Sequence, residues 1–258
     1  MSSEGEQNNN TPARGSLRLA PNVEELEEHK RKIPRQFVNF TFYRARQEWR
    51  MMADDKKSAC KRSFIESIDD FRPHLLIQSY STIGLRTSAD FMIWRIGTDL
   101  DPMQEMTARL NQTQMAKYLE PTHSLLSMTK RSMFIESNCT EHTADRTHII
   151  PGQTDYLFVC PLQRTREWYS RPQEQRQEMM EESLRIGSKY RSVKLHTTYS
   201  FGLDDQEFVV AFETNKPADF LDLFQELRET KASCFTLRDT PMFTCRKRSL
   251  AECLDALG

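Results

Sequence analysis

The chain contains the stretch Thr197-Thr-Tyr-Ser-Phe-Gly-Leu-Asp-Asp-Gln-Glu-Phe-Val-Val-Ala-Phe-Glu-Thr214. Its last part, from Phe208, is almost entirely apolar and rich in β-forming residues, which predicts a strand buried on both faces. Gly202, Asp204 and Asp205 are typical of a tight turn, because glycine tolerates positive φ and Asp side chains bond their own backbone. The stretch therefore predicts a strand, a turn and a second strand.

The same pattern occurs earlier in the chain. Tyr80-Ser-Thr-Ile-Gly-Leu-Arg86 again ends in a Gly-Leu turn, and Tyr80 precedes Tyr199 by 199 − 80 = 119 residues. A Glu-Trp pair repeats at the same offset, since Trp49 and Trp168 are also 168 − 49 = 119 residues apart. Two motifs at one offset indicate an internal duplication.

Composition excludes several classes of protein. The formal net charge is −1, with acids and bases interspersed, so we expect neither a nucleic-acid footprint nor a polybasic membrane anchor. There is no apolar run of bilayer length and no secretory pattern at the amino terminus, which favours a cytoplasmic protein. The six cysteines include no C-x-x-C pair and are expected to be reduced.

The order of elements predicts two similar halves. Each half reads strand–helix–strand–strand–helix–strand, the order of a ferredoxin-like α+β unit. We expect a disordered tail and lead-in over 1–34, a first repeat over 35–137, a polar linker over 138–154 and a second repeat over 155–258. Two such units can enclose an apolar space that is either core or a ligand site. The expected strands are 37–43, 74–81, 91–97, 132–136, 156–160, 191–200, 207–214 and one within 235–246; the expected helices are 56–71, 172–186, 218–228, 250–257 and one starting near 101.

Five segments together form a recognisable pattern: Phe37-Val-Asn-Phe-Thr-Phe-Tyr43 with Trp49, Tyr80 to Arg86 with Ala89-Asp-Phe91, Glu167-Trp-Tyr169, Gly202-Leu-Asp-Asp205 and Thr236-Leu-Arg-Asp-Thr240. They resemble the chlorite dismutase family, which includes the coproheme decarboxylases, and the resemblance covers nearly all of the chain from Phe37 to Leu257. It implies two tandem ferredoxin-like repeats of the dimeric α/β-barrel type, ring assembly (usually a homopentamer) and haem or coproheme bound in the second repeat.

The family's functional positions differ here. The resemblance implies a proximal His on the helix of the second half, three residues after a Met. Counting from Met180 puts that position at Ser183, whereas counting back from Gly202 puts it at Glu182; the Ile-Gly that follows favours Ser183. Serine is a poor iron ligand and a carboxylate is a rare one for haem.

Three further positions of the family can be placed. The distal residue, Arg in chlorite dismutases and often Gln in the decarboxylases, falls on His196 if the helix position is Ser183 and on Leu195 if it is Glu182. The redox-active Tyr that the decarboxylases carry before a Pro is Cys160 here. Arg164 replaces a lysine near the propionates, so it counts among the expected cofactor-binding positions.

Each of these residues has two interpretations. His196 could be an iron or other metal ligand from the strand side, or an acid/base group. Alternatively, its side chain faces solvent or a polar neighbour. The alternation of the strand does not decide between these, because a shift of one residue in register would turn the side chain to the other face. Cys160 could be a thiolate ligand or a redox thiol, and in an apolar strand it is more commonly inert core.

Two functions therefore compete. The resemblance implies a haem-dependent oxidoreductase of coproheme-decarboxylase type, and a true chlorite dismutase is disfavoured because neither distal candidate is Arg. The missing His and Tyr instead favour a divergent non-haem paralogue that acts as a scaffold, binds another small molecule, or joins a ring with an active paralogue.

Overall fold

The structure, a computed structural model, describes residues 34–132, 134 and 148–258. Residues Arg35–Gly258 form one compact unit. Residues 1–33 of the predicted tail, residues 133, 135 and 136 of the predicted 132–136 strand, and most of the predicted linker lie outside the described residues. The boundaries of the two repeats stay a prediction.

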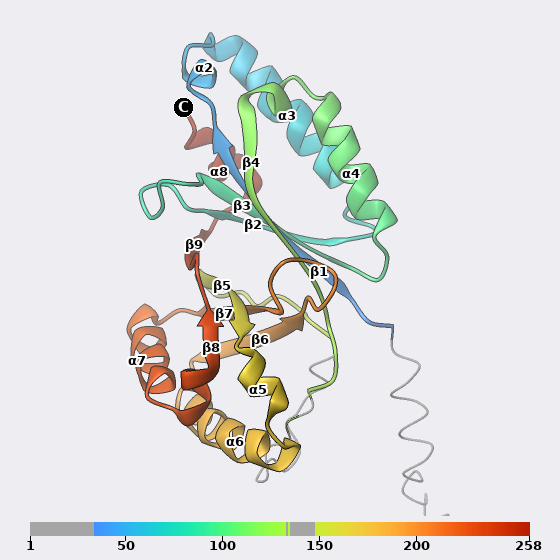
Figure 1. Ribbon diagram of the computed structural model, residues 1–258. Coiled ribbons are helices and arrows are strands. Elements are labelled where there is room, and N and C mark those ends of the chain that lie inside the picture. Colours follow the sequence, from blue (N-terminus) through green and yellow to red (C-terminus); the bar gives the residue numbers. More distant parts are fainter. Residues whose placement is uncertain (1–33, 133, 135–147) are drawn as a thin grey trace, which may run out of the picture. The chain divides into compact units, whose positions relative to one another are not determined.

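The first half contains four strands and the helices that cover them (Figure 1). Strand β1 is longer than predicted, and the two strands around the first Gly-Leu turn lie where the pattern predicts them. The elements are β1 (Phe37–Ala45), α2 (Gln47–Arg50), α3 (Asp54–Asp69), β2 (Leu76–Ser81), β3 (Phe91–Gly97), α4 (Asp101–Gln112), the 3-10 helix η1 (Met115–Tyr118) and β4 (Leu119–Met128).

The second half repeats this order and ends with one more helix. Its last predicted strand is two strands, separated by residues 239–242. The elements are β5 (Tyr156–Arg164), α5 (Arg166–Ser170), α6 (Gln173–Lys189), β6 (Val193–Tyr199), β7 (Phe208–Thr214), α7 (Pro217–Arg228), η2 (Lys231–Phe235), β8 (Thr236–Arg238), β9 (Phe243–Lys247) and α8 (Leu250–Asp255).

The strands of both halves join into one closed antiparallel barrel. The hydrogen-bonded order is β7-β6-β4-β1-β3-β2-β9-β5-β8, and a further β5–β7 pairing closes the ring. The halves meet where β2 pairs with β9 and where Met128 of β4 pairs with Tyr199 of β6. This confirms the α+β class with two ferredoxin-like repeats.

The predicted strand 132–136 lies mostly outside the described residues, and the fourth strand that the structure describes, Leu119–Met128, was not predicted. Pro121 and the polar residues around it interrupt the alternation of apolar and polar residues that would predict this strand. Pro121 lies where the register with β1 shifts between Phe42 and Tyr43, and a proline without an N–H is tolerated at such an irregularity.

The two Gly-Leu turns adopt the conformation that the sequence predicts. Gly84 has φ +74° and Gly202 has φ +72°, values that favour glycine. Each turn also holds the last part of the other half. The Arg86 guanidinium donates to the backbone oxygen of Met242, and the backbone N–H of Leu126 donates to the Asp204 carboxylate. The turns therefore join the two repeats.

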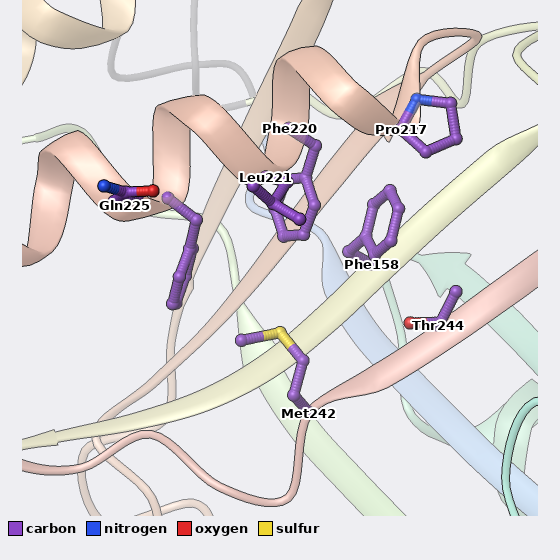
Figure 2. Close-up of a pocket in the computed structure, with 8 residues that line it drawn as sticks. Phe158, Pro217, Phe220, Leu221, Gln225, Met242 and Thr244 are labelled. Carbon is purple, nitrogen blue, oxygen red and sulfur yellow. The ribbon is translucent and has the colours of Figure 1, made fainter.

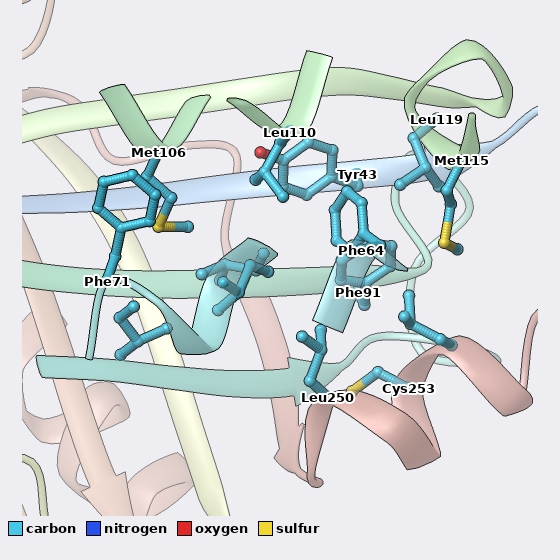
Figure 3. Close-up of a cluster of buried hydrophobic side chains, with 14 of the residues drawn as sticks. Tyr43, Phe64, Phe71, Phe91, Met106, Leu110, Met115, Leu119, Leu250 and Cys253 are labelled. Atoms are coloured by element: carbon cyan, nitrogen blue, oxygen red, sulfur yellow. The ribbon is translucent and has the colours of Figure 1, made fainter. Parts of the chain in front are cut away.

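Three apolar clusters stabilise the fold. One fills the barrel and includes Phe40, Trp94 and Phe243. A second lies between the first-half strands and the helices α3, α4 and α8 (Figure 3). The third lies between the second-half strands and α7. The C-terminal helix α8 thus packs on the first half of the chain.

Candidate functional site

Among the residues that the structure describes, the apolar cluster under the second-half helices has fewer buried side chains than the cluster under the first-half helices. The first-half cluster has eighteen buried side chains, whereas the second-half cluster has four, namely Phe158, Phe212, Phe220 and Leu223. Helices α3 and α4 each bury several residues, but none of the residues of α6 is fully buried. Two copies of one architecture therefore differ in how completely the space under their helices is filled.

The residues at the centre of the inward face of α6 explain this difference. Arg176, Met180, Ser183 and Gly187 recur at helical spacing and are all partly buried, while Glu178, Arg185 and others on the opposite side are exposed. A methyl group placed on Gly187 would meet no heavy atom within 4 Å outside its own turns of helix. A small side chain at position 187 would therefore have room on the inward face of α6.

The sheet contributes an apolar surface on its helix-covered face. Along the register, Leu195 pairs with Phe212 and Phe212 with Phe158, while Thr197 pairs with Val210 and Val210 with Cys160. Phe158, Cys160 and Phe212 are buried, but on β6 Leu195 remains 42% exposed and Thr197 is exposed as well. The part of the sheet on β6 is thus left uncovered. We use the name α6 pocket for the inward-facing residues of α6 together with these strand residues.

His196 lies on the other face of the sheet, inside the barrel. It is 8% exposed, its ring lies 5.8 Å from that of Trp94, and its Nε2 is 2.5 Å from Oε1 of Glu213. The helix-covered face at this point carries Leu195 instead. The ambiguity in the strand is resolved, and the structure does not bring His196 together with Ser183.

The two candidate positions on α6 contact Thr230 and Lys231, where η2 begins. Ser183 Oγ lies 3.4 Å from Thr230 Oγ1, and the Glu182 carboxylate accepts a 3.0 Å hydrogen bond from the backbone N–H of Lys231. Both side chains therefore help to dock α6 against this segment.

Cys160 faces the helix layer, as the register of β5 requires. It is 3% exposed, and its Sγ lies 3.1 Å from the backbone oxygen of Asp239. Burial, with a smaller contribution from the negative charge of Asp239, raises the pKa of the thiol to about 12. A thiol that stays protonated is a poor nucleophile and a poor metal ligand.

Arg164 is held by the protein itself. Its guanidinium donates to the backbone oxygen of Ala232 at 2.5 Å and to Thr236 Oγ1 at 3.2 Å, and lies over the ring of Trp168. Burial lowers the pKa of the guanidinium, which still remains charged. Arg164 thus ties β5 to the η2 region.

These donors do not fit a haem iron held by a protein ligand. Such an iron needs a strong axial donor, normally an imidazole, and α6 carries neither His nor Cys. Within the described residues, no group of three or more His, Cys, Asp or Glu side chains could hold a metal ion. Nor does any described helix have the length and apolar character needed to cross a membrane.

A groove lies elsewhere in the second half, between α7 and the strands β5 and β9 (Figure 2). It measures about 480 Å³ and includes no residue of α6 and none of the predicted site residues. Its lining is Phe158, Pro217, Phe220, Leu221, Phe224, Gln225, Met242 and Thr244.

Arg176 and Gly187 were missed by the sequence analysis. The helical period that places Met180 on the inward face also places Arg176 one turn before it and Gly187 two turns after it. The helical spacing of Arg176 and Gly187 from Met180 was therefore the sequence signal that could have identified them.

Comparison with known proteins identifies the family. The model of the chlorite dismutase family, described as "Chlorite dismutase", matches residues 56–248. The chain belongs to the chlorite dismutase family. It is 31% identical over 166 residues to the coproheme decarboxylase of Mycolicibacterium smegmatis, a match that covers 64% of this chain and 70% of that one. It is 23% identical to the chlorite dismutase of Ideonella dechloratans, over 80% of this chain and 73% of that one.

The fold of the family agrees with the structure. The chain superposes on a chlorite dismutase from Candidatus Nitrospira defluvii with a TM-score of 0.79 at 22% identity, over 90% of this chain and 98% of that one. The chain therefore shares the fold of this chlorite dismutase.

Proposed function

We propose that the protein binds a tetrapyrrole in the α6 pocket without coordinating its metal, and that it does not carry out oxidative decarboxylation. The observation that supports this most is the pairing of Ser183 with Gly187 on the inward face of α6. These residues leave space beside the helix and supply no iron ligand. The proposal retains the ligand class implied by the family and gives up its iron chemistry.

The comparisons support the choice of ligand. One relative is a coproheme decarboxylase by name, at 31% identity, whereas the match to a chlorite dismutase is at 23%. Ligand pockets in proteins are mostly apolar with a few polar groups, and the face formed by Leu195, Val210 and Phe212 has this character.

The residues that would be needed for redox chemistry are absent or occupied elsewhere. His196 is hydrogen-bonded to Glu213 inside the barrel, away from α6. Cys160 stands in the place of an oxidisable tyrosine, and its thiol is buried with a pKa of about 12. Neither residue supports the acid/base or radical step that the family resemblance implies.

The test is a titration of the purified protein with ferric coproheme, followed by absorbance in the Soret region. We expect a saturable change at one ligand per chain, without the spectrum of an imidazole-ligated iron. Ser183→His should tighten binding at least tenfold and produce that spectrum. Ser188→His is the matched control, because Ser188 lies on the exposed side of the same helix.

Peroxide addition tests the second part of the proposal. We expect mass spectrometry to find coproheme with all its propionates after incubation of the wild-type complex with peroxide. Conversion to haem b by the wild-type protein would overturn the loss of catalysis. A folded protein that gives no saturable spectral change would instead overturn tetrapyrrole binding.

We also propose that the protein assembles into a cytoplasmic homo-oligomeric ring, as the family resemblance implies. Exposed apolar side chains at the two Gly-Leu turns support self-association: Leu85 is 52% exposed and Phe201 is 51% exposed. Light scattering after size-exclusion chromatography should give a mass of about five chains. A monomer at micromolar concentration would contradict the ring.

A further inference from the structure

Arg176 has a buried side-chain nitrogen without a partner. Its Nε is inaccessible to solvent and has no hydrogen-bond acceptor, although the residue lies on the same face of α6 as Ser183 and Gly187. Arg164, by contrast, donates to the backbone oxygen of Ala232. Arg171 donates through Nη2 to the Glu167 carboxylate, although its own Nε is also buried without a partner.

A guanidinium on the inward face of a helix is costly unless something accepts its hydrogen bonds. An apolar residue at this position would have filled part of the space beside α6. Arginine's planar fork matches the two oxygens of a carboxylate, which is the acceptor that would satisfy it best. The α6 pocket therefore has a cation at one end and an apolar sheet face along its side.

The spacing on the helix sets where an acidic group would lie. Seven residues separate Arg176 from Ser183, which is about 10 Å along the helix axis. The acid must therefore be at the periphery of the ligand, away from the part that lies beside Ser183.

We propose that Arg176 binds a carboxylate of the pocket ligand, so that the pocket selects an apolar molecule with an acidic side chain over its neutral ester. This inference rests on the proposed tetrapyrrole-binding function and specifies the chemistry of recognition. It assigns a positioning residue that selects the ligand without reacting with it.

The experiment compares metal-free coproporphyrin III with its tetramethyl ester, by quenching of tryptophan fluorescence. The variants are Arg176→Gln and Arg185→Gln. Arg185 lies on the exposed side of α6, so its replacement removes the same charge from the same helix without altering the pocket. The ratio of ester to acid dissociation constants is measured within each protein, so a partly unfolded fraction does not distort it.

We expect the wild-type protein and Arg185→Gln to prefer the acid by roughly 10–100-fold, the difference that one charge-assisted hydrogen-bonded pair typically makes. In Arg176→Gln the preference should fall to about twofold. Arg176→Lys, which keeps the charge but lacks the planar fork, should retain an intermediate preference.

An equal acid preference in Arg176→Gln and Arg185→Gln would overturn the assignment of Arg176. Equal binding of acid and ester by the wild-type protein would do the same. Failure of the wild-type protein to bind either porphyrin would overturn the proposed function itself. If Arg176→Gln does not fold, the Arg176→Lys ratio decides, because an unchanged ratio there would also contradict recognition by the fork.

Discussion

His196 Nε2 lies 2.5 Å from Oε1 of Glu213, and both side chains point into the barrel from neighbouring strands. The other oxygen of Glu213 accepts hydrogen bonds from the backbone N–H of Gly152 at 2.6 Å and from Thr154 Oγ1 at 3.3 Å. Lys247 Nζ donates to the backbone oxygen of Gly152 as well. The chain that enters the second half is therefore anchored by side chains of its own sheet.

Replacing Glu213 by Gln should destabilise the protein in a pH-dependent way. Burial alone would raise the pKa of the Glu213 carboxyl, but the hydrogen bond and charge of His196 and the N–H of Gly152 hold it below its ordinary value. A carboxyl whose folded pKa is lowered stabilises the fold above its unfolded pKa, and this stabilisation is lost as pH falls through the folded value.

The check is urea unfolding of both proteins between pH 7 and pH 3. At pH 7 the variant should be less stable by about 2–4 kcal/mol, since removal of one partner of a buried pair is costly. The difference should shrink below about pH 4. A difference that stays constant with pH would contradict this account.

Two glycines should respond to alanine in opposite directions. A Cβ at Gly152 would lie 2.7 Å from Oε2 of Glu213, so Gly152→Ala should lower the free energy of unfolding by about 1–3 kcal/mol. A Cβ at Gly187 meets nothing, so Gly187→Ala should raise it by about 0.5–1 kcal/mol through the better helix propensity of alanine. Chemical denaturation measures both, and equal effects would show that the packing around these sites differs from that described.

The two aspartates of the second turn should not be equivalent. Asp204 Oδ2 accepts hydrogen bonds from the backbone N–H of Leu126 and from Gln206 Nε2, both at 2.8 Å, whereas Asp205 is exposed. Asp204→Ala should cost about 1–3 kcal/mol because it leaves a donor of the other half unpaired. Asp205→Ala is the control and should change the unfolding free energy by less than about 0.5 kcal/mol.

The cysteines should react at very different rates. Cys234 is exposed, whereas Cys160, Cys245 and Cys253 are buried with raised thiol pKa values. Since the thiolate is the reactive form, brief alkylation of the native protein at pH 7 should label Cys234 and leave these three unmodified. Peptide mapping by mass spectrometry checks this, and labelling of Cys160 at a rate near that of Cys234 would contradict its burial.

Local signals predicted the features that depend on a few adjacent residues. Gly84 and Gly202 have the positive φ that their turns require, and α4 starts at Asp101, where the sequence predicts a helix starting near 101. Features that depend on distant partners were not predictable in this way. His196 points into the barrel, where it contacts Glu213 and Trp94, and the periodicity of its own strand does not reveal contacts with residues so distant in sequence. Strand β4 was not predicted because Pro121 interrupts its alternating pattern.

The packing of α8 on the first half has a consequence for how the protein is made. Leu250, Cys253, Leu254 and Leu257 belong to the same buried cluster as Phe64 and Phe91. During synthesis, the first half emerges from the ribosome long before these residues do, so part of its helix-covered face stays in contact with water until residues 250–257 have been made. In a nascent chain halted after β9, all strands of the barrel could already pair. The apolar cluster of the first half would still lack the side chains of α8 that cover it.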